Sequence, residues 1–408
     1  MEVLYSRCAG LDVHQRTVVA CVRLAAGATV QQEVRTFGTA TRDVLALADW
    51  LTSHGCTHVA MESTGVYWKP IWHVLDGAFE LILANALQIR SVPGRKTDVN
   101  DAMWIADLLA HGLIRGSFVP PAPIHELRDL TRTRKQLVRE VAQHTLRIQK
   151  VLEDANLKLT SVLSDVLGMS GRAMLEAIIR GEEDPERLAD LSQGRLKASR
   201  PAVVDALQGR VTAHHRFLLR LHLTHIDILE SAVREVEARL GEALVPFHAA
   251  VDRLMTIPAV RQTVARVIVA EIGFDMTRFP TAGHLVSWAG LCPRLDESAG
   301  KRRSTRTRPG APWLKTALVQ AAWVAARTRN TYLRAQFLRL KSRRGPKKAI
   351  LAVAASMLTA AYYILKNETT YLELGADYFE RRNKTQIARR LVKRLESLGL
   401  TVEIQPAA

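Results

Sequence analysis

Four acidic residues in the N-terminal quarter of the chain suit metal-assisted phosphate chemistry. Asp12 interrupts an apolar strand pattern, and Glu62 ends another. Asp98 and Asp101 stand three residues apart at the start of a predicted helix, so they share one helical face. Carboxylates from two strands and a helix can hold two Mg²⁺ ions about 4 Å apart, which stabilises the attacking and leaving oxygens in phosphoryl transfer. Mg²⁺ is the expected cofactor because hard oxygen ligands dominate and no His/Cys cluster competes.

Each of these acids also has a simpler explanation. Asp98 could cap the helix, Asp101 could offset the helix dipole, and Glu62 could be a surface charge at a strand end. Asp12 is harder to explain in this way because it lies inside the apolar run 9–13. The four acids together, in this order, therefore make a stronger prediction than any one of them.

The elements that must position the acids form an α/β domain, predicted over residues 1–118. Alternating and β-branched patterns predict strands, and apolar residues at helical spacing predict helices. The predicted strands are 9–13, 17–22, 33–37, 57–62 and 81–84, and the predicted helices include 41–53 and 98–111. Three strands, a helix, a strand, a helix, a strand and a helix is the order of a ribonuclease-H-like fold.

Three further regions follow a proline-rich break at 120–123. Residues 119–244 are predicted as a helical coiled-coil region, with long amphipathic helices at 126–154 and 219–240 that would serve in dimerisation or as a spacer. Residues 245–366 are predicted as a mainly α domain, in which 254–272 resembles a helix-hairpin-helix that presents backbone amides to a DNA phosphate. Residues 367–408 form a tail. The apolar stretch 349–365 is predicted as a buried helix because it falls short of the roughly 20 apolar residues that span a bilayer.

The chain is strongly basic, with 57 Lys and Arg against 40 Asp and Glu, a formal net charge of +17. This favours a polyanionic partner, above all nucleic acid, with a membrane surface as the other anionic candidate. Residues 298–366 contain no acid at all. A solvated basic face is the plain explanation, but such faces normally mix signs, so the run is expected to lie along phosphates. The candidate contacts are Lys301, Arg302, Arg303, Arg306 and Arg308.

Cysteine usage indicates a reducing compartment. The chain has four cysteines, none in a CxxC pair, so free thiols are expected. The N-terminal residues show no signal-peptide pattern, and a cytoplasmic bacterial protein is the expectation.

Two ordered signatures resemble a known family. Asp12 in Gly-Leu-Asp-Val, Glu62 in Met-Glu-Ser-Thr-Gly-Val-Tyr, and Asp98 with Asp101 in Lys-Thr-Asp-Val-Asn-Asp-Ala resemble the DEDD transposases of bacterial insertion sequences of the IS-one-ten type, also called bridge recombinases. The stretch 288–294, Trp-Ala-Gly-Leu-Cys-Pro-Arg, followed by 297–301, Glu-Ser-Ala-Gly-Lys, is similar to the second signature of that family. The resemblance covers about residues 6–118 and 250–365.

The resemblance implies a RuvC-like N-terminal domain whose four acids bind Mg²⁺, and a C-terminal serine that forms a covalent phosphoserine with DNA. Carried over by motif, that serine is Ser298. The resemblance also implies dimers or tetramers, and a structured RNA that guides DNA recognition. Two motifs depart from the family pattern. The hairpin that usually has Pro-Gly-Ile-Gly is Pro-Ala-Val-Arg at 258–261, and a Ser-Lys-x-Gly element is Thr-Arg-Pro-Gly at 307–310.

The sequence therefore predicts a transposase or recombinase that cuts and rejoins DNA. An ordinary loop serine is the plain explanation of Ser298 when its motif is ignored, and Ser304 is the nearest alternative nucleophile. A phosphoserine would conserve the energy of the phosphodiester bond, in keeping with the absence of a GxxxxGK[ST] loop from the sequence. The alternative is a RuvC-like metal-dependent nuclease or junction resolvase in which water attacks. A non-enzymatic basic nucleic-acid-binding protein explains the charge but not the four acids.

Overall fold

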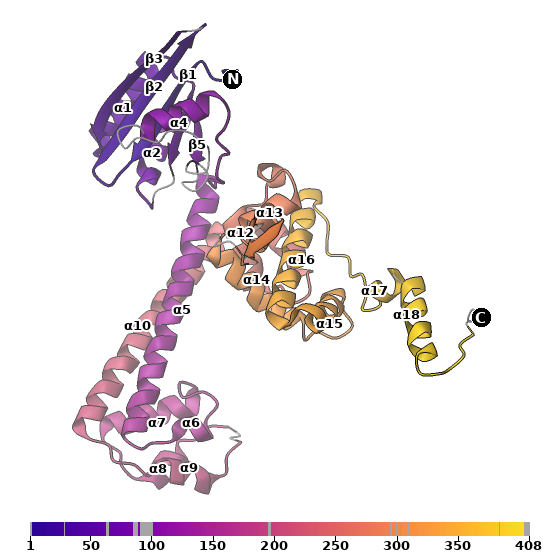
Figure 1. Cartoon of the computed structure of the whole chain (residues 1–408). Coiled ribbons are helices and arrows are strands. Elements are labelled where there is room, and N and C mark those ends of the chain that lie inside the picture. The colour runs from indigo at the N-terminus through magenta and orange to yellow at the C-terminus, as the bar shows by residue number, and fades with distance from the viewer. Residues whose placement is uncertain are drawn as a thin grey trace. The chain divides into compact units, whose positions relative to one another are not determined.

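A computed structural model describes residues 2–27, 29–62, 65–84, 89, 101–194, 197–293, 296–298, 300–304, 306–307, 310–382 and 384–403. The chain divides into two compact units, Met1–Val119 and Pro120–Ala408 (Figure 1).

The first unit is built on a five-stranded mixed sheet with the strand order β3-β2-β1-β4-β5. Strands β1, β2 and β3 are antiparallel neighbours, whereas β4 pairs with β1 and β5 with β4 in parallel. The strands are β1 Arg7–Val13, β2 Thr17–Ala26, β3 Thr29–Gly38, β4 His58–Glu62 and β5 Glu80–Ala84. The helices are α1 Thr41–Ser53, α2 Trp68–Leu75 and α4 Asp101–Ala110. The predicted element order is confirmed, which gives an α/β domain. Residues 98–100 of the last predicted helix lie outside the described residues.

Helices cover both faces of this sheet because β1 and β4 are apolar on both sides. Ala9 and Leu11 pack with buried residues of α1 and α2 on one face. Cys8 and Ala60 pack with buried residues of α4 on the other. Successive side chains of a strand point to opposite faces, so even-numbered residues of β1 and β4 face α4.

All four cysteines are free thiols, as predicted. Three of them are buried in the first unit, and burial raises the pKa of the Cys8 and Cys21 thiols to about 12 and that of Cys56 to about 11.

The second unit begins with a two-helix arm. The helix α5, Ala122–Asp154, packs along α10, Ala213–Ala243, in antiparallel fashion, since Glu126 bonds with Arg239 near one end and Asp154 with His215 at the other. Four short helices close the far end over an apolar core: α6 Leu159–Val162, α7 Met169–Arg180, α8 Pro185–Asp190 and α9 Arg200–Ala206. Both long helices extend beyond the predicted ranges.

The remaining elements are mainly helical, as predicted. They are η1 Val245–Phe247, α11 His248–Met255, α12 Gln262–Ile272, η2 Met276–Arg278, α13 Ala282–Trp288, the hairpin β6 Asp296–Ser298 and β7 Lys301–Ser304, α14 Pro312–Ala325, α15 Tyr332–Arg344, α16 Pro346–Asn367, α17 Tyr378–Arg382 and α18 Lys384–Glu396. Among the described helices, α16 is long and apolar enough to cross a bilayer by length and composition, but 56% of its most apolar window is buried inside the protein. The predicted buried helix is thus confirmed.

Candidate functional site

Asp12 and Glu62 lie on neighbouring parallel strands at matching positions. The pairing of β1 with β4 ends at Leu11 and Met61, and each acid is the next residue along its strand. Parallel neighbouring strands are about 4.8 Å apart, and residues at matching positions point to the same face. The two carboxylates are therefore placed side by side. Glu62 is buried, with 8% of its surface exposed, and the side chain of Asp12 is 18% exposed.

The face that carries these acids is the face that α4 covers. A Cβ built on Gly10 would lie 2.3 Å from the Ala102 carbonyl oxygen and 2.4 Å from the Ala106 nitrogen, so only glycine permits this close approach. The Cys8 thiol, two residues earlier, bonds to the Ala106 carbonyl at 3.6 Å. The strand thus runs against the direction of α4, and Asp12, two residues after Gly10, points toward the start of that helix.

Asp101 is the first residue of α4 and is half-buried. Two strand-borne carboxylates and a helix-borne one are thus directed to one end of the sheet, on the face that α4 covers. Asp98 lies outside the described residues. Within the described part of the chain, no group of three or more His, Cys, Asp or Glu side chains forms a ready-made metal cluster. The hard oxygen donors nonetheless suit Mg²⁺ in their chemistry.

His14 stands beside Asp12, a contact that sequence reasoning missed. Its Nε2 lies 3.1 Å from the Asp12 Oδ2, and its side chain is 57% exposed. The strand ends at Val13, and the backbone N–H of His14 bonds to the Thr17 carbonyl in the turn to β2. The i, i+2 spacing of Asp12 and His14 was the available signal.

Ser298 is the last residue of β6. It pairs with Lys301 at the start of β7, and Gly300 in the turn has φ 72°, a left-handed conformation that suits glycine. Lys301 and Arg306 are exposed. Arg302 and Arg303 belong to β7, but only their backbone is described. The side chain of Ser298 and the whole of Arg308 also lie outside the described part of the chain.

Gly310, between the hairpin and α14, packs tightly against the turn that follows α13. A Cβ on Gly310 would lie 2.4 Å from the backbone nitrogen of Gly290, and both glycines have positive φ, at 58° and 72°. The Lys315 ammonium on α14 donates to the Thr307 hydroxyl at 2.9 Å. The backbone N–H of Arg306 donates to the Ser304 hydroxyl at 3.2 Å, so Ser304 takes part in a local turn.

The turn between α11 and α12 has a left-handed backbone conformation at a residue that is not glycine. Ala259 has φ 69°, in the region that L-residues with a Cβ rarely occupy. It stands where the hairpin of the resembled family has its first glycine. The Val260 N–H bonds to the Ile257 carbonyl at 3.0 Å and closes the turn.

An ion pair with a buried carboxylate holds this helical hairpin on the arm. Glu271 in α12 is 1% exposed and accepts two bonds from Arg132 of α5, at 2.8 and 2.9 Å. Arg128 donates to the Glu271 carbonyl oxygen at 2.5 Å, and burial lowers the pKa of this guanidinium. Sequence reasoning missed Glu271, although an acid in the apolar run of α12 was a visible signal.

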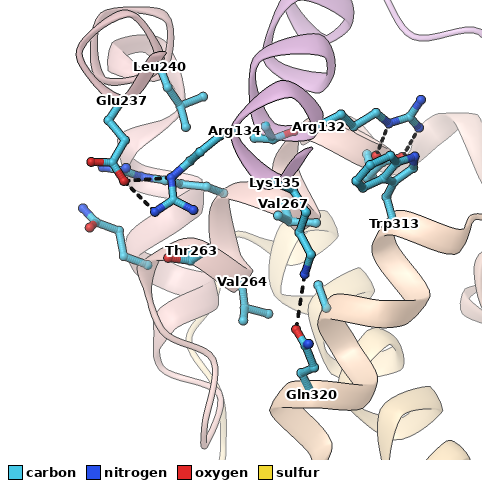
Figure 2. Close-up of a pocket in the computed structure, with 15 residues that line it drawn as sticks. Arg132, Arg134, Lys135, Glu237, Leu240, Thr263, Val264, Val267, Trp313 and Gln320 are labelled. Atoms are coloured by element: carbon cyan, nitrogen blue, oxygen red, sulfur yellow. Dashed lines mark hydrogen bonds and ion pairs between the residues drawn. The ribbon is translucent and has the colours of Figure 1, made fainter. Parts of the chain in front are cut away.

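A cavity of about 210 Å³ opens beside this ion pair, between α5, α10, α12 and α14. Figure 2 shows Arg134 reaching Glu237 and Lys135 reaching Gln320 across it, and these bonds measure 2.7 and 3.5 Å. Burial, with Arg139 and Arg134 nearby, lowers the pKa of the Lys135 ammonium. The pocket is more cationic than anionic, which suits an anionic ligand.

Comparison with known proteins places the chain among transposases. The sequence profile of a DEDD transposase family, described as "Transposase", matches residues 9–157. The profile described as "Transposase IS116/IS110/IS902 family" matches residues 251–338. An insertion element IS110 protein of 43.6 kDa from Streptomyces coelicolor, described as uncharacterised, is 27% identical over 304 residues, which are 68% of this chain and 73% of that protein. The chain belongs to the IS110-type transposase family.

Proposed function

We propose that the protein cuts and rejoins DNA as the recombinase of an insertion sequence, with Ser298 as the nucleophile. The observation that carries the proposal is the alignment of Asp12 with Glu62, each one residue beyond the paired part of β1 and β4, on the face covered by α4 in a chain that belongs to a transposase family. The sheet order β3-β2-β1-β4-β5 supports a ribonuclease-H-like, RuvC-like fold for the first unit.

In the proposed reaction the Ser298 oxygen attacks the scissile phosphorus. A serine–phosphate bond forms, the bond from phosphorus to a DNA oxygen breaks, the serine hydroxyl loses its proton, and the departing oxygen gains one. Attack by a hydroxyl of a second DNA end reverses these changes and joins the ends. One phosphodiester is exchanged for another, so no ATP is consumed. The cations Lys301 and Arg306 are exposed near the hairpin and would offset phosphate charge.

Asp12, Glu62, Asp98 and Asp101 would hold Mg²⁺, which when bound stabilises negative charge on the attacking and leaving oxygens. The buried carboxylate of Glu62 and the partly buried carboxylate of Asp12 support this role, because like charges side by side in a poorly solvated place are costly without a cation. His14 would orient the Asp12 carboxylate through its 3.1 Å contact.

We also propose that the partners include DNA, a structured guide RNA, and further copies of the chain in a homodimer or homotetramer. The net charge of +17 supports a nucleic-acid partner, and the two-helix arm supports the proposal of an oligomer.

The test is incubation of labelled DNA carrying the ends of the element with the full chain, followed by a denaturing gel. We expect a protein–DNA adduct that needs Mg²⁺ and is absent from Ser298→Ala but present in Ser304→Ala. An adduct in the Ser298→Ala variant would remove Ser298 from the role. Metal-dependent cleavage without any adduct would instead support the RuvC-like nuclease in which water attacks.

A further inference from the structure

The C-terminal tail is attached to α15 by a cluster of aromatic rings. The Tyr332 ring stacks on Phe379 with centroids 5.1 Å apart, and it meets Tyr378 edge-on at 5.2 Å. The Tyr332 backbone N–H donates to the Glu373 carboxylate at 2.7 Å. The Arg339 guanidinium lies over the Phe379 ring, 4.7 Å from its centroid. These contacts hold α17 against α15.

A wide groove lies between α15 and the tail helices, with a volume of about 1110 Å³. We call it the basic groove, because seven of its lining residues are cations: Arg329, Arg334, Arg339, Arg343, Arg389, Arg390 and Lys393. Glu380 is the one acid among the described residues that line it. Leu338, Phe379 and Ile387 add apolar surface.

Several arginines of the arm have carboxylate partners, such as Arg134 with Glu237 and Arg239 with Glu126. Within the described part of the chain, none of the seven groove cations forms an ion pair. Like charges gathered in excess and without ion-pair contacts repel one another, and a polyanion that binds them and releases its own counterions relieves this repulsion.

We propose that the basic groove binds the sugar-phosphate backbone of a nucleic acid. The tail would then provide a nucleic-acid contact separate from the one proposed at the Ser298 hairpin. This inference rests on the proposed function, because it supposes a nucleic-acid substrate or guide. The Phe379 ring is already covered by Tyr332 and Arg339, so backbone contact is favoured over base stacking. The exposed Leu391 and Leu395 on α18 also suit an anionic membrane surface, but cations from two separate elements around a groove favour a polymer.

The test uses the full chain with Arg389→Gln, Arg390→Gln and Lys393→Gln combined. The matched control removes the same charge at the far end of the arm, with Arg180→Gln, Arg187→Gln and Lys197→Gln. Binding to a short random duplex DNA and to a short RNA hairpin is measured without Mg²⁺ over a series of salt concentrations. We expect the slope of log K against log salt to shrink by roughly two to three in the groove variant with at least one probe, and to stay unchanged in the control.

The probe whose salt dependence becomes weaker in the groove variant, DNA or RNA, identifies the backbone that the groove binds. Equal losses in the groove and control variants, or no loss with either probe, would overturn the proposal. Loss of binding only to vesicles of anionic lipid would assign the groove to a membrane. Strand cleavage is not measured, so a failure of the Ser298 chemistry leaves this test intact. Circular dichroism and the melting temperature check that the exposed substitutions leave the fold unchanged.

Discussion

Asp12 and Glu62 each stand one residue beyond the last paired residues of two parallel strands, Leu11 and Met61. Both carboxylates therefore face α4, at the end of the sheet where that helix begins with Asp101. The strand pairing brings together acids that are fifty residues apart in the sequence. A glycine makes the arrangement possible, because α4 lies directly on Gly10.

Gly10→Ala should therefore damage both stability and activity. The new Cβ would lie 2.3 Å from the Ala102 carbonyl oxygen, so α4 must shift and carry Asp101 with it. We expect a loss of about 1–3 kcal/mol in the free energy of unfolding, measured in urea, together with loss of strand cleavage. Gly116→Ala is the matched control, since its Cβ would meet only Ile82 at 3.6 Å. Equal stability of the two variants would contradict the close packing of α4.

Ala259→Gly should stabilise the turn between α11 and α12. Ala259 has φ 69°, a conformation that costs an L-residue about 1–2 kcal/mol, and the greater freedom of glycine in the unfolded chain cancels part of the gain. We expect a net gain of about 0.5–1 kcal/mol in urea unfolding. Ala259→Val should have the opposite effect. A destabilising Ala259→Gly would show that the turn does not adopt this conformation.

Glu271→Gln should loosen the attachment of α12 to the arm. Glu271 is 1% exposed, and removing its charge leaves Arg132 facing a neutral amide. Breaking a fully buried pair costs about 3–5 kcal/mol, and because the Arg132 side chain is 34% exposed we expect a loss of about 2–3 kcal/mol, which a urea titration would detect. Glu237→Gln is the control, because that residue pairs with Arg134 at 42% exposure and such surface pairs contribute at most about 1 kcal/mol. Similar losses in the two variants would contradict a special role for Glu271.

The arm should lose stability in mild acid through His144 and His222. Their Nδ1 atoms lie 3.2 Å apart, so one must donate and the other accept. Burial is the main cause that lowers the pKa of both imidazoles. Arg147 lowers the pKa of His144 further, and His144 lowers that of His222. The folded state then binds fewer protons than the unfolded state below about pH 6.5, so stability falls as the pH drops through that range.

His222→Gln should flatten this dependence between about pH 7 and 5 in a series of urea titrations. His248→Gln changes an exposed histidine on α11 and should leave the pH dependence of stability the same as in the unaltered chain. An unchanged slope in His222→Gln would show that the two imidazoles do not titrate as described.

The sequence pattern predicted the elements better than their limits. The strand expected at 33–37 spans Thr29–Gly38. The sequence pattern missed its first residues because β3 is an edge strand that is exposed up to Thr36, so its polar first half shows no alternation of apolar residues. The helix expected to start at residue 219 begins at Ala213, where Thr212 and His215 form a capping box. A first turn rich in histidine carries no apolar periodicity.

The residue types of the candidate site could likewise be predicted from the sequence, but their arrangement in space could not. The types and spacing of Asp12 and Glu62 pointed to a metal site, but their alignment depends on which strands pair, a property of distant parts of the chain. The partner of Glu271 is separated from it by 139 residues. The left-handed backbone at Ala259 had no local signal, because alanine is not a residue that favours it.

Metal binding by Asp12 and Glu62 tests the central claim most directly. Calorimetric titration of Mg²⁺ into the full chain, Asp12→Asn, Glu62→Gln and the control Glu80→Gln would compare loss of the same charge at different points of the sheet. We predict that affinity falls by about tenfold or more in the first two variants and is unchanged in Glu80→Gln, an exposed position at the start of β5. Equal affinity in the unaltered chain and in both site variants would contradict the metal assignment.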